Sequence, residues 1–526
     1  MQNRWLKKLR VILSLLFFLV ITLLYLDFTG RIYHNVTLSL THLQFVPSLI
    51  LFIETGTHLA LGFALILLLT LLFGRIYCST LCPMGTLQDL FIYLTRRLSP
   101  RKIIFKHKEP NNWIRYSIIA VVVLSLLTGS LILVNLTDPY SMFGKIAHNL
   151  FLPARTLLNN IVAKGHSLLK LYYLYPVKWV PVNPAAFLLS LSWFLLVLIL
   201  SIKRGRIYCN TICPVGALLG LVARISVFRI RLDKSLCNSC GKCSAVCKAE
   251  CINPKDQGLD FSRCVGCMNC LSPCPEGGVR IEPFWKKEKV KITAFDPARR
   301  KFIGETGMLV AATFATGKIF AQDTIKETKR EVIPATVPIF REHPVTPPGS
   351  LDRARFNSLC TACHLCASAC PTQVLQPSWI HYGLRGFLQP RMDYITSFCN
   401  FECDLCGKVC PTGAILELPL EEKKLVQMGL AKFVKENCIV YTKNTACGAC
   451  SEHCPTKAVK MVPYKDKLTI PETTDKICIG CGACEYACPT DPKSIYVEGN
   501  PVHLLAEKPK EEKIKEITDY KEEFPF

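Results

Sequence analysis

The 29 cysteines of this 526-residue chain mostly follow one repeated spacing that suits iron–sulfur chemistry. Six runs approach the pattern of three cysteines two residues apart, a fourth cysteine three residues later, and a proline. In two-cluster ferredoxins, the first three cysteines of such a run bind one [4Fe–4S] cluster and the fourth binds the other. Four-cysteine zinc sites use two separated pairs, so the spacing favours clusters over zinc. The sequence therefore predicts six [4Fe–4S] clusters.

The first two runs are neighbours in the sequence, and the crossed rule of two-cluster ferredoxins assigns their ligands. Lysine rather than proline follows Cys247, and Cys251 lies close by, so either thiol could be the ligand. The regular spacing favours Cys247. The predicted sets are Cys237, Cys240, Cys243 with Cys274, and Cys264, Cys267, Cys270 with Cys247.

Four further runs follow a proline-rich segment, residues 332–348. The first of them also contains Cys360-Thr361-Ala362-Cys363-His364, which matches a c-type haem attachment site. The same cysteines continue in the cluster spacing, which favours the cluster. The four runs are Cys360, Cys363, Cys366, Cys370; Cys399, Cys403, Cys406, Cys410; Cys438, Cys447, Cys450, Cys454; and Cys478, Cys481, Cys484, Cys488.

The part of the chain before residue 203 is strongly apolar and predicts a helical membrane domain with four spans. Each apolar run approaches the length of about 20 residues that a bilayer requires. Basic residues concentrate at 4–10, 96–108 and 203–234, which the positive-inside rule places in the cytoplasm. The net charge of +23 is explained by these flanks better than by nucleic-acid binding. The predicted spans are residues 11–26, 55–73, 116–137 and 185–202.

A twelve-residue motif occurs twice in this apolar part, at residues 74–85 and 205–216. Both copies begin Gly-Arg-Ile-Tyr-Cys, both contain a C-x3-C-P pair, and both follow an apolar run. The four cysteines could converge on a metal or cluster, could form two redox dithiols, or could mark structural turns at which proline breaks a helix. They are Cys78, Cys82, Cys209 and Cys213.

A fifth candidate membrane segment, residues 298–321, is only mildly apolar and begins with Arg299-Arg300-Lys301. This start is similar to a twin-arginine export signal, which would move the folded domain after it to the outer side. The expected domains are 1–230 (four-span membrane domain), 231–290 (two-cluster ferredoxin), 298–325 (signal or anchor), 326–350 (linker), 351–500 (four-cluster ferredoxin) and 501–526 (charged tail). The fold class is thus an α-helical membrane domain plus α+β ferredoxin-like domains.

Taken together, these motifs resemble a fusion of NapH and NapG, which supply electrons to periplasmic nitrate reductases. The second half equally resembles the MauM/NapG ferredoxin family. Residues 1–290 are NapH-like, and residues 298–495, with Pro347-Pro348-Gly349, are NapG-like. The resemblance implies quinol oxidation and electron transfer through the clusters to a periplasmic reductase. The fusion departs from the family and leaves the acceptor open.

For NapG-type domains the resemblance also implies which runs share clusters. Runs one and four would share two clusters, and runs two and three would share the other two. The implied sets are Cys360, Cys363, Cys366 with Cys488; Cys478, Cys481, Cys484 with Cys370; Cys399, Cys403, Cys406 with Cys454; and Cys438, Cys447, Cys450 with Cys410.

A quinone site needs an apolar pocket and a side chain that handles protons, and Glu54 and His58 near the start of the second span are the candidates. The leading hypothesis is a quinol dehydrogenase component in the bacterial inner membrane. Its partners would be membrane lipid, the quinone pool and a periplasmic reductase or cytochrome, with no nucleic acid. The two-cluster domain would be cytoplasmic and the four-cluster domain periplasmic. The alternatives are a transmembrane conduit fed by cytoplasmic ferredoxin and a non-catalytic redox or assembly factor.

Overall fold

The computed structural model describes residues 3–27, 36–56, 61–99, 105, 107–168, 170, 173–179, 182–285 and 337–508. It contains two compact units, of which one comprises Met1–Pro283 and Val337–Phe526 and the other Phe284–Thr336. The segment with the twin-arginine motif lies outside the described residues.

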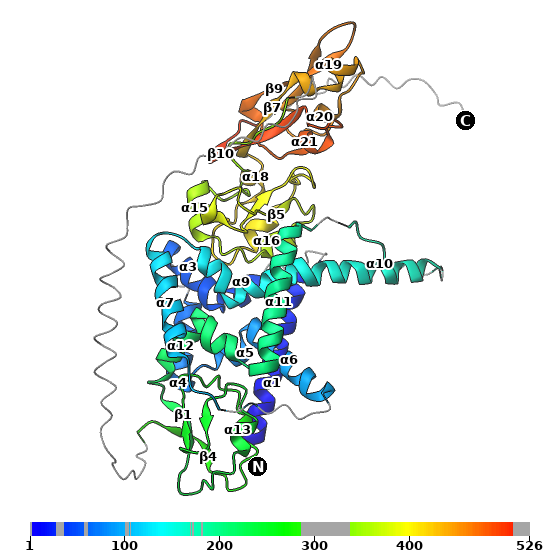
Figure 1. Cartoon of the computed structure of the whole chain (residues 1–526). Coiled ribbons are helices and arrows are strands. Elements are labelled where there is room, and N and C mark those ends of the chain that lie inside the picture. The colour runs from blue at the N-terminus through cyan, green and yellow to red at the C-terminus, as the bar shows by residue number, and fades with distance from the viewer. Residues whose placement is uncertain are drawn as a thin grey trace, which may run out of the picture. The chain divides into compact units, whose positions relative to one another are not determined.

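The N-terminal part is a bundle of helices, shown in blue to green in Figure 1. Its helices are α1 (Asn3–Leu26), α2 (Val36–His42), α3 (Phe45–Thr55), α4 (Gly62–Phe73), α5 (Tyr77–Thr80), α6 (Pro83–Leu98), α7 (Asn112–Leu127), α8 (Ile132–Thr137), α9 (Pro139–Ile146), α10 (Leu152–Leu168), α11 (Pro184–Arg204) and α12 (Pro214–Ala223). Two π-helical turns, η2 (Ala147–Phe151) and η3 (Tyr208–Ile212), interrupt it.

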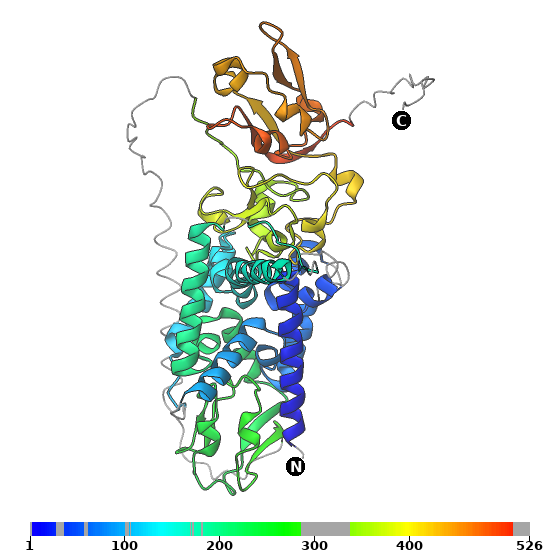
Figure 2. The ribbon, with the colours of Figure 1, turned by 90° about the vertical axis from the view of Figure 1, so that its right-hand side faces the viewer.

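Two helices in the described residues are long and apolar enough to cross a membrane, Trp5–Leu26 and Pro184–Arg204. They correspond to the first and fourth predicted spans and run in opposite chain directions along the bundle (Figures 1 and 2). The second prediction corresponds to α4, which begins only at Gly62, and the third is divided between α7 and α8 by residues 128–131. The prediction of four full-length spans is therefore not confirmed.

The two repeated motifs fold alike, because the same residues start and stop the helices. A glycine with positive φ, Gly74 or Gly205, ends the preceding helix. Proline occupies the first turn of α6 and of α12, where its missing N–H costs no hydrogen bond. In each copy the second cysteine is the N-cap, Cys82 or Cys213.

The two-cluster domain follows α12 and consists of short elements around two cysteine-rich loops. Strand β1 (Phe228–Leu232) pairs antiparallel with β4 (Val279–Pro283), and β2 (Ile252–Asn253) pairs with β3 (Gly258–Leu259). Helix α13 (Lys242–Ala245) and the 3-10 turn η4 (Asn269–Leu271) each carry a cysteine of a run.

The four-cluster domain is built in the same way. Antiparallel pairs join β5 (Leu375–Pro377) to β6 (Pro390–Met392), β7 (Val426–Phe433) to β10 (Ile495–Leu505), and β8 (Val459–Pro463) to β9 (Thr469–Thr473), with a register shift in β10 between Gly499 and Leu504. Its helices are α15 (Arg353–Leu359), α16 (Leu365–Ala369), α17 (Leu405–Lys408), α18 (Leu420–Lys423), α19 (Ile439–Lys443), α20 (Ala449–Glu452) and α21 (Ala483–Ala487), with 3-10 turns η5 (Leu384–Gly386), η6 (Lys435–Asn437) and η7 (Asp475–Ile477).

The buried core is built largely around cysteine. One continuous cluster of buried side chains contains cysteines from all six runs and the four cysteines of the repeated motif. Short strands and short helices bury little apolar surface of their own, so bound clusters would contribute much of the folding free energy of these domains.

Candidate functional site

The structure brings the first predicted ligand set together. Cys237, Cys240, Cys243 and Cys274 line one pocket, together with Leu232 at the end of β1 and Val279 at the start of β4. The backbone N–H of Gly278 donates to Cys274 Sγ at 3.2 Å, as N–H groups do around cluster sulfurs. The four thiols fit one [4Fe–4S] cluster, ligated by the crossed rule.

In the second set, either Cys247 or Cys251 could be the fourth ligand. Their Sγ atoms lie 3.5 Å apart, and both are buried beside Cys264. Either thiol could donate the hydrogen bond between them, and Cys251 also contacts the Cys264 thiol. Cys247 therefore stays the predicted ligand on its regular spacing, with Cys251 as the alternative.

In the four-cluster domain the structure corrects the implied pairing of the runs. Cys370 of run one lines a pocket with Cys399, Cys403 and Cys406 of run two. Cys410 of run two lies within electrostatic reach of Cys360, Cys363 and Cys366. Runs one and two therefore exchange their fourth cysteines, instead of pairing with runs four and three.

Runs three and four exchange in the same way. Cys454 lies within electrostatic reach of Cys478, Cys481 and Cys484, and Cys488 within reach of Cys450. The physical reason is that α16 packs on α17 and α20 packs on α21, so each pair of consecutive runs forms a closed unit. The corrected sets are Cys360, Cys363, Cys366 with Cys410; Cys399, Cys403, Cys406 with Cys370; Cys438, Cys447, Cys450 with Cys488; and Cys478, Cys481, Cys484 with Cys454.

Both ring nitrogens of His364 have protein partners, so this side chain is not available to bind a haem. It is almost fully buried, its Nε2 lies 2.8 Å from Leu388 O, and its Nδ1 lies 3.5 Å from Asn149 Nδ2. These contacts agree with the cluster reading of this run. They also join the run to η2, which carries Asn149.

The helical bundle and run one are in direct contact at several points. The Tyr25 hydroxyl at the end of α1 donates to Cys363 O at 3.2 Å. His148 Nδ1 on η2 lies 2.9 Å from Ser368 Oγ. At Gly144, a Cβ would lie only 2.1 Å from Cys363 O, so the close approach of α9 requires glycine. The sequence analysis did not identify these residues, because nothing in a single sequence pairs residue 148 with residue 368.

Glu54 forms an ion pair with Arg355 of α15, at 3.0 Å, and His58 lies outside the described residues. Arg355 also donates to Gly413 O at 2.9 Å. The contact joins α3 to the four-cluster domain. The geometry therefore gives Glu54 a docking contact, whereas the sequence suggested a role at a quinone site.

If quinol reduces the clusters, replacing Glu54 with glutamine is expected to leave the rate of that reduction unchanged. The two side chains are 34% and 16% exposed, and pairs of this kind contribute about 1 kcal/mol or less. Stopped-flow reduction of the purified protein by a menaquinol analogue checks this. A loss of quinol-dependent reduction, with dithionite reduction intact, would return Glu54 to the quinone site.

The two repeats meet in the bundle core. Cys78, Cys82, Cys209 and Cys213 are each at most 4% exposed and lie within electrostatic reach of one another. Asp89 on α6 lies beside them and forms ion pairs with Arg206, Arg10 and Lys248, at 2.8, 3.2 and 3.1 Å. In the described part of the chain, no group of three or more His, Cys, Asp and Glu side chains could hold a single metal ion.

Two family models of iron–sulfur proteins match the chain. A 4Fe–4S binding domain matches residues 55–102 and 186–233, and a 4Fe–4S dicluster domain matches residues 359–414 and 445–491. Each dicluster match joins consecutive runs, in agreement with the corrected ligand sets. The first model matches the two repeated motifs, each of which has only two cysteines.

A putative electron transport protein, YccM, and several ferredoxin-type proteins are similar to the chain. It is 28% identical to YccM of Escherichia coli over 213 residues (40% of this chain, 51% of YccM) and 28% identical to the ferredoxin-type protein NapH of the same organism over 222 residues (40% of this chain, 63% of NapH). It is 38% identical to the ferredoxin-type protein MauM of Methylophilus methylotrophus over 98 residues (18% of this chain, 42% of MauM), and MauN proteins also match. The chain spans about half the length of these relatives, and no solved structure matches it. The chain therefore contains 4Fe–4S domains and is similar to the ferredoxin-type proteins NapH, MauN and MauM.

Proposed function

We propose that the chain is a membrane-bound electron carrier that takes electrons from quinol and passes them through its [4Fe–4S] clusters to an acceptor on the periplasmic side. The observation that carries this proposal is that α1 contacts both iron–sulfur domains, at its two ends. Lys7 and Lys8, near its start, line a hollow with Ser272 of the two-cluster domain. Tyr25, near its end, binds run one of the four-cluster domain.

The length of α1 supports a position across a bilayer. Its 24 residues correspond to about 36 Å of helix, against a hydrocarbon core of about 30 Å. Lysines at its start favour the cytoplasm for that end. The two-cluster domain then lies in the cytoplasm, the four-cluster domain lies in the periplasm, and six clusters are divided two and four between them.

Helix α10 adds a second indication of the membrane surface. It runs across the direction of α1 and α11 (Figures 1 and 2). Leu157, Leu158, Ile161 and Leu168 are exposed on it. An apolar face on a helix of this orientation suits the boundary between headgroups and acyl chains.

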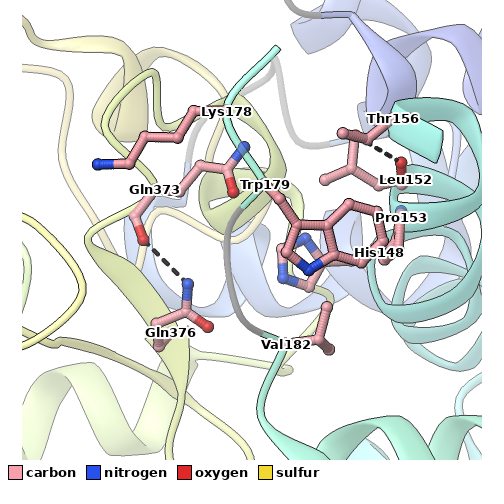
Figure 3. Close-up of a pocket in the computed structure, with 9 residues that line it drawn as sticks. All are labelled: His148, Leu152, Pro153, Thr156, Lys178, Trp179, Val182, Gln373 and Gln376. Atoms are coloured by element: carbon pink, nitrogen blue, oxygen red, sulfur yellow. Dashed lines mark hydrogen bonds between the residues drawn. The ribbon is translucent and has the colours of Figure 1, made fainter. Parts of the chain in front are cut away.

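A pocket of about 420 Å³ lies beside α10, and it is the best candidate for the quinol site (Figure 3). Its lining includes His148, Leu152 and Trp179 from the bundle and Gln373 and Gln376 from the four-cluster domain. Small-molecule sites are typically lined by apolar side chains with a few polar groups. Quinol here would be reached from the lipid and would adjoin run one.

His148 is the side chain that would handle the quinol proton. It sits on a π-helical turn, a feature that often marks functional sites. Burial lowers its pKa to about 4, so the imidazole is neutral at pH 7 and can accept a hydrogen bond from a quinol hydroxyl. Oxidation releases two protons and two electrons, and the clusters accept the electrons one at a time.

Replacing His148 with phenylalanine is expected to slow quinol-dependent cluster reduction by about 10²-fold, because positioned proton acceptors contribute that much or more. Reduction by dithionite should not change. His166→Phe, on α10 and outside the lining of this pocket, is the matched control. Equal rates of quinol oxidation in both variants would contradict the placement of the site.

A second candidate function, a conduit from cytoplasmic ferredoxin, is favoured by the continuity of contacts between the two iron–sulfur domains. Reduced ferredoxin added outside inverted vesicles should then reduce the four-cluster domain without quinone. Vesicles depleted of quinone separate the two functions, since only the conduit keeps its activity. Protease mapping of residues 350–495 in sealed vesicles tests the topology that both functions require.

A further inference from the structure

The four cysteines of the repeated motif form a site that the six ferredoxin-type runs do not need. They come from two copies of one motif and are all buried in the bundle core. Each copy by itself offers only two thiols, while a [4Fe–4S] cluster takes four. A site of four therefore exists only where the copies meet.

The contacts between the copies are reciprocal. Arg75 of the first copy donates to Cys209 O at 2.9 Å, and Arg206 of the second donates to Cys78 O at 2.6 Å. A Cβ at Gly85 would lie 2.1 Å from Cys78 O, and one at Gly216 would lie 2.1 Å from Cys209 O. Each arginine thus holds the cysteine of the other copy, and each glycine lets a helix approach its own copy's cysteine closely.

The buried positive charge of Arg75 at this site needs a negatively charged group nearby. Arg75 is fully buried, and in the described residues it has no carboxylate partner, although it lies near Arg115. The Arg75 guanidinium contacts Asn210 Oδ1, Ser262 O, Cys209 O and, at 3.9 Å, Cys78 Sγ. A buried guanidinium without a counter-ion is strongly unfavourable. Four thiolates around a cluster would supply the missing negative charge.

Hydrogen-bond donors already point at the sulfurs. Gln88 Nε2 lies 3.2 Å from Cys209 Sγ, and Gly216 N lies 3.3 Å from Cys213 Sγ. Donors to sulfur favour the thiolate and tune cluster potentials. Two dithiols that cycle to disulfides would leave the charge of Arg75 unmatched in the oxidised state.

We propose that Cys78, Cys82, Cys209 and Cys213 together hold a single additional [4Fe–4S] cluster, shared between the two repeats inside the helical bundle. The four thiols lose their protons as the four Fe–S bonds form. This inference goes beyond the proposed function, because it adds a seventh cluster and stands whether or not quinol is the donor.

A cluster at this site would offer a path for electrons between the two iron–sulfur domains. Toward the two-cluster domain, Arg75 donates to Ser262 O at 3.1 Å, next to the run that begins at Cys264. Toward the four-cluster domain, the buried Tyr77 and Tyr208 lie near Asp138, which lies within electrostatic reach of Cys363. The site therefore lies between the two sets of clusters.

The test is a metal count on the full-length protein, purified without oxygen and with its clusters reconstituted. Wild type should hold about 28 iron and 28 sulfide per chain, which is seven clusters of four. The double variant Cys78→Ala, Cys209→Ala should lose about four of each, and Ser79→Ala, a buried neighbour on α5, should lose none. About 24 iron in the wild type, zinc at these thiols, or unchanged iron in the double variant would overturn the proposal.

Gln88→Leu keeps the test decisive if the double variant does not fold. All four thiols remain, so the iron count should not change. Loss of the N–H donor should make the midpoint potential of one cluster more negative in an EPR-monitored titration, and leave the other signals in place. An unchanged set of potentials would overturn the proposal.

Discussion

Replacing Asp89 with asparagine is expected to destabilise the helical part of the protein by about 3–5 kcal/mol, the largest stability effect of any single substitution considered for this chain. Asp89 is 12% exposed and is the shared partner of Arg10, Arg206 and Lys248. These three cations belong to α1, to the second repeat and to the two-cluster domain. Asparagine keeps the size of the side chain and removes the charge, so three buried cations would lose their counter-ion.

The shift is measured as the midpoint of thermal unfolding in detergent, and as the amount of protein that accumulates in membranes. Glu421→Gln is the matched control, because Glu421 also pairs with a lysine but is 81% exposed, and such pairs contribute about 1 kcal/mol or less. An Asp89→Asn protein with the midpoint of the control would show that the cations are balanced elsewhere.

The second large effect is expected at the two-cluster domain, where Cys247→Ala should remove one whole cluster. Three cysteines cannot complete a four-thiolate site, and Cys247 has the regular spacing of the run, with the Cys251 thiol 3.5 Å away. Iron analysis should show a loss of about four iron atoms per chain. The EPR signal of one cluster should disappear, with the signals of the four-cluster domain retained.

Cys251→Ala is the control for this prediction and should retain the full iron content. Loss of its hydrogen bond should make the potential of the Cys247 cluster more negative, because donors to sulfur stabilise the more negative reduced state. If Cys251→Ala loses a cluster and Cys247→Ala does not, the ligand is Cys251, and the regular spacing of the run is misleading.

The sequence was sufficient to predict iron–sulfur clusters and candidate ligands, because ligand spacing is a local property. A loop with cysteines two residues apart presents three sulfurs to one cluster wherever the loop lies. The same local reasoning recognised the repeated motif and its Cys78 and Cys209. It also found the two longest apolar helices, which correspond to α1 and α11.

Cysteine spacing alone could not predict which runs share clusters in the four-cluster domain. Every run supplies a fourth cysteine, and Cys410 or Cys488 could equally serve run one by sequence. Only the packing of α16 on α17 brings Cys410 to Cys360 and Cys363. The division of the third predicted span between α7 and α8, at residues 128–131, was likewise not predicted.

The sequence by itself therefore determined the chemistry of this protein: cysteine thiolates in ferredoxin-type runs, joined to an apolar helical part. Tertiary structure alone decided how the thiols combine. It exchanged fourth cysteines between neighbouring runs, placed His148 against Ser368 and brought the two repeats together around Arg75 and Arg206. The physical reason is that a thiol's identity is encoded locally, whereas a cluster or pocket needs side chains from distant segments, whose approach is set by packing and by the pairing of buried charge.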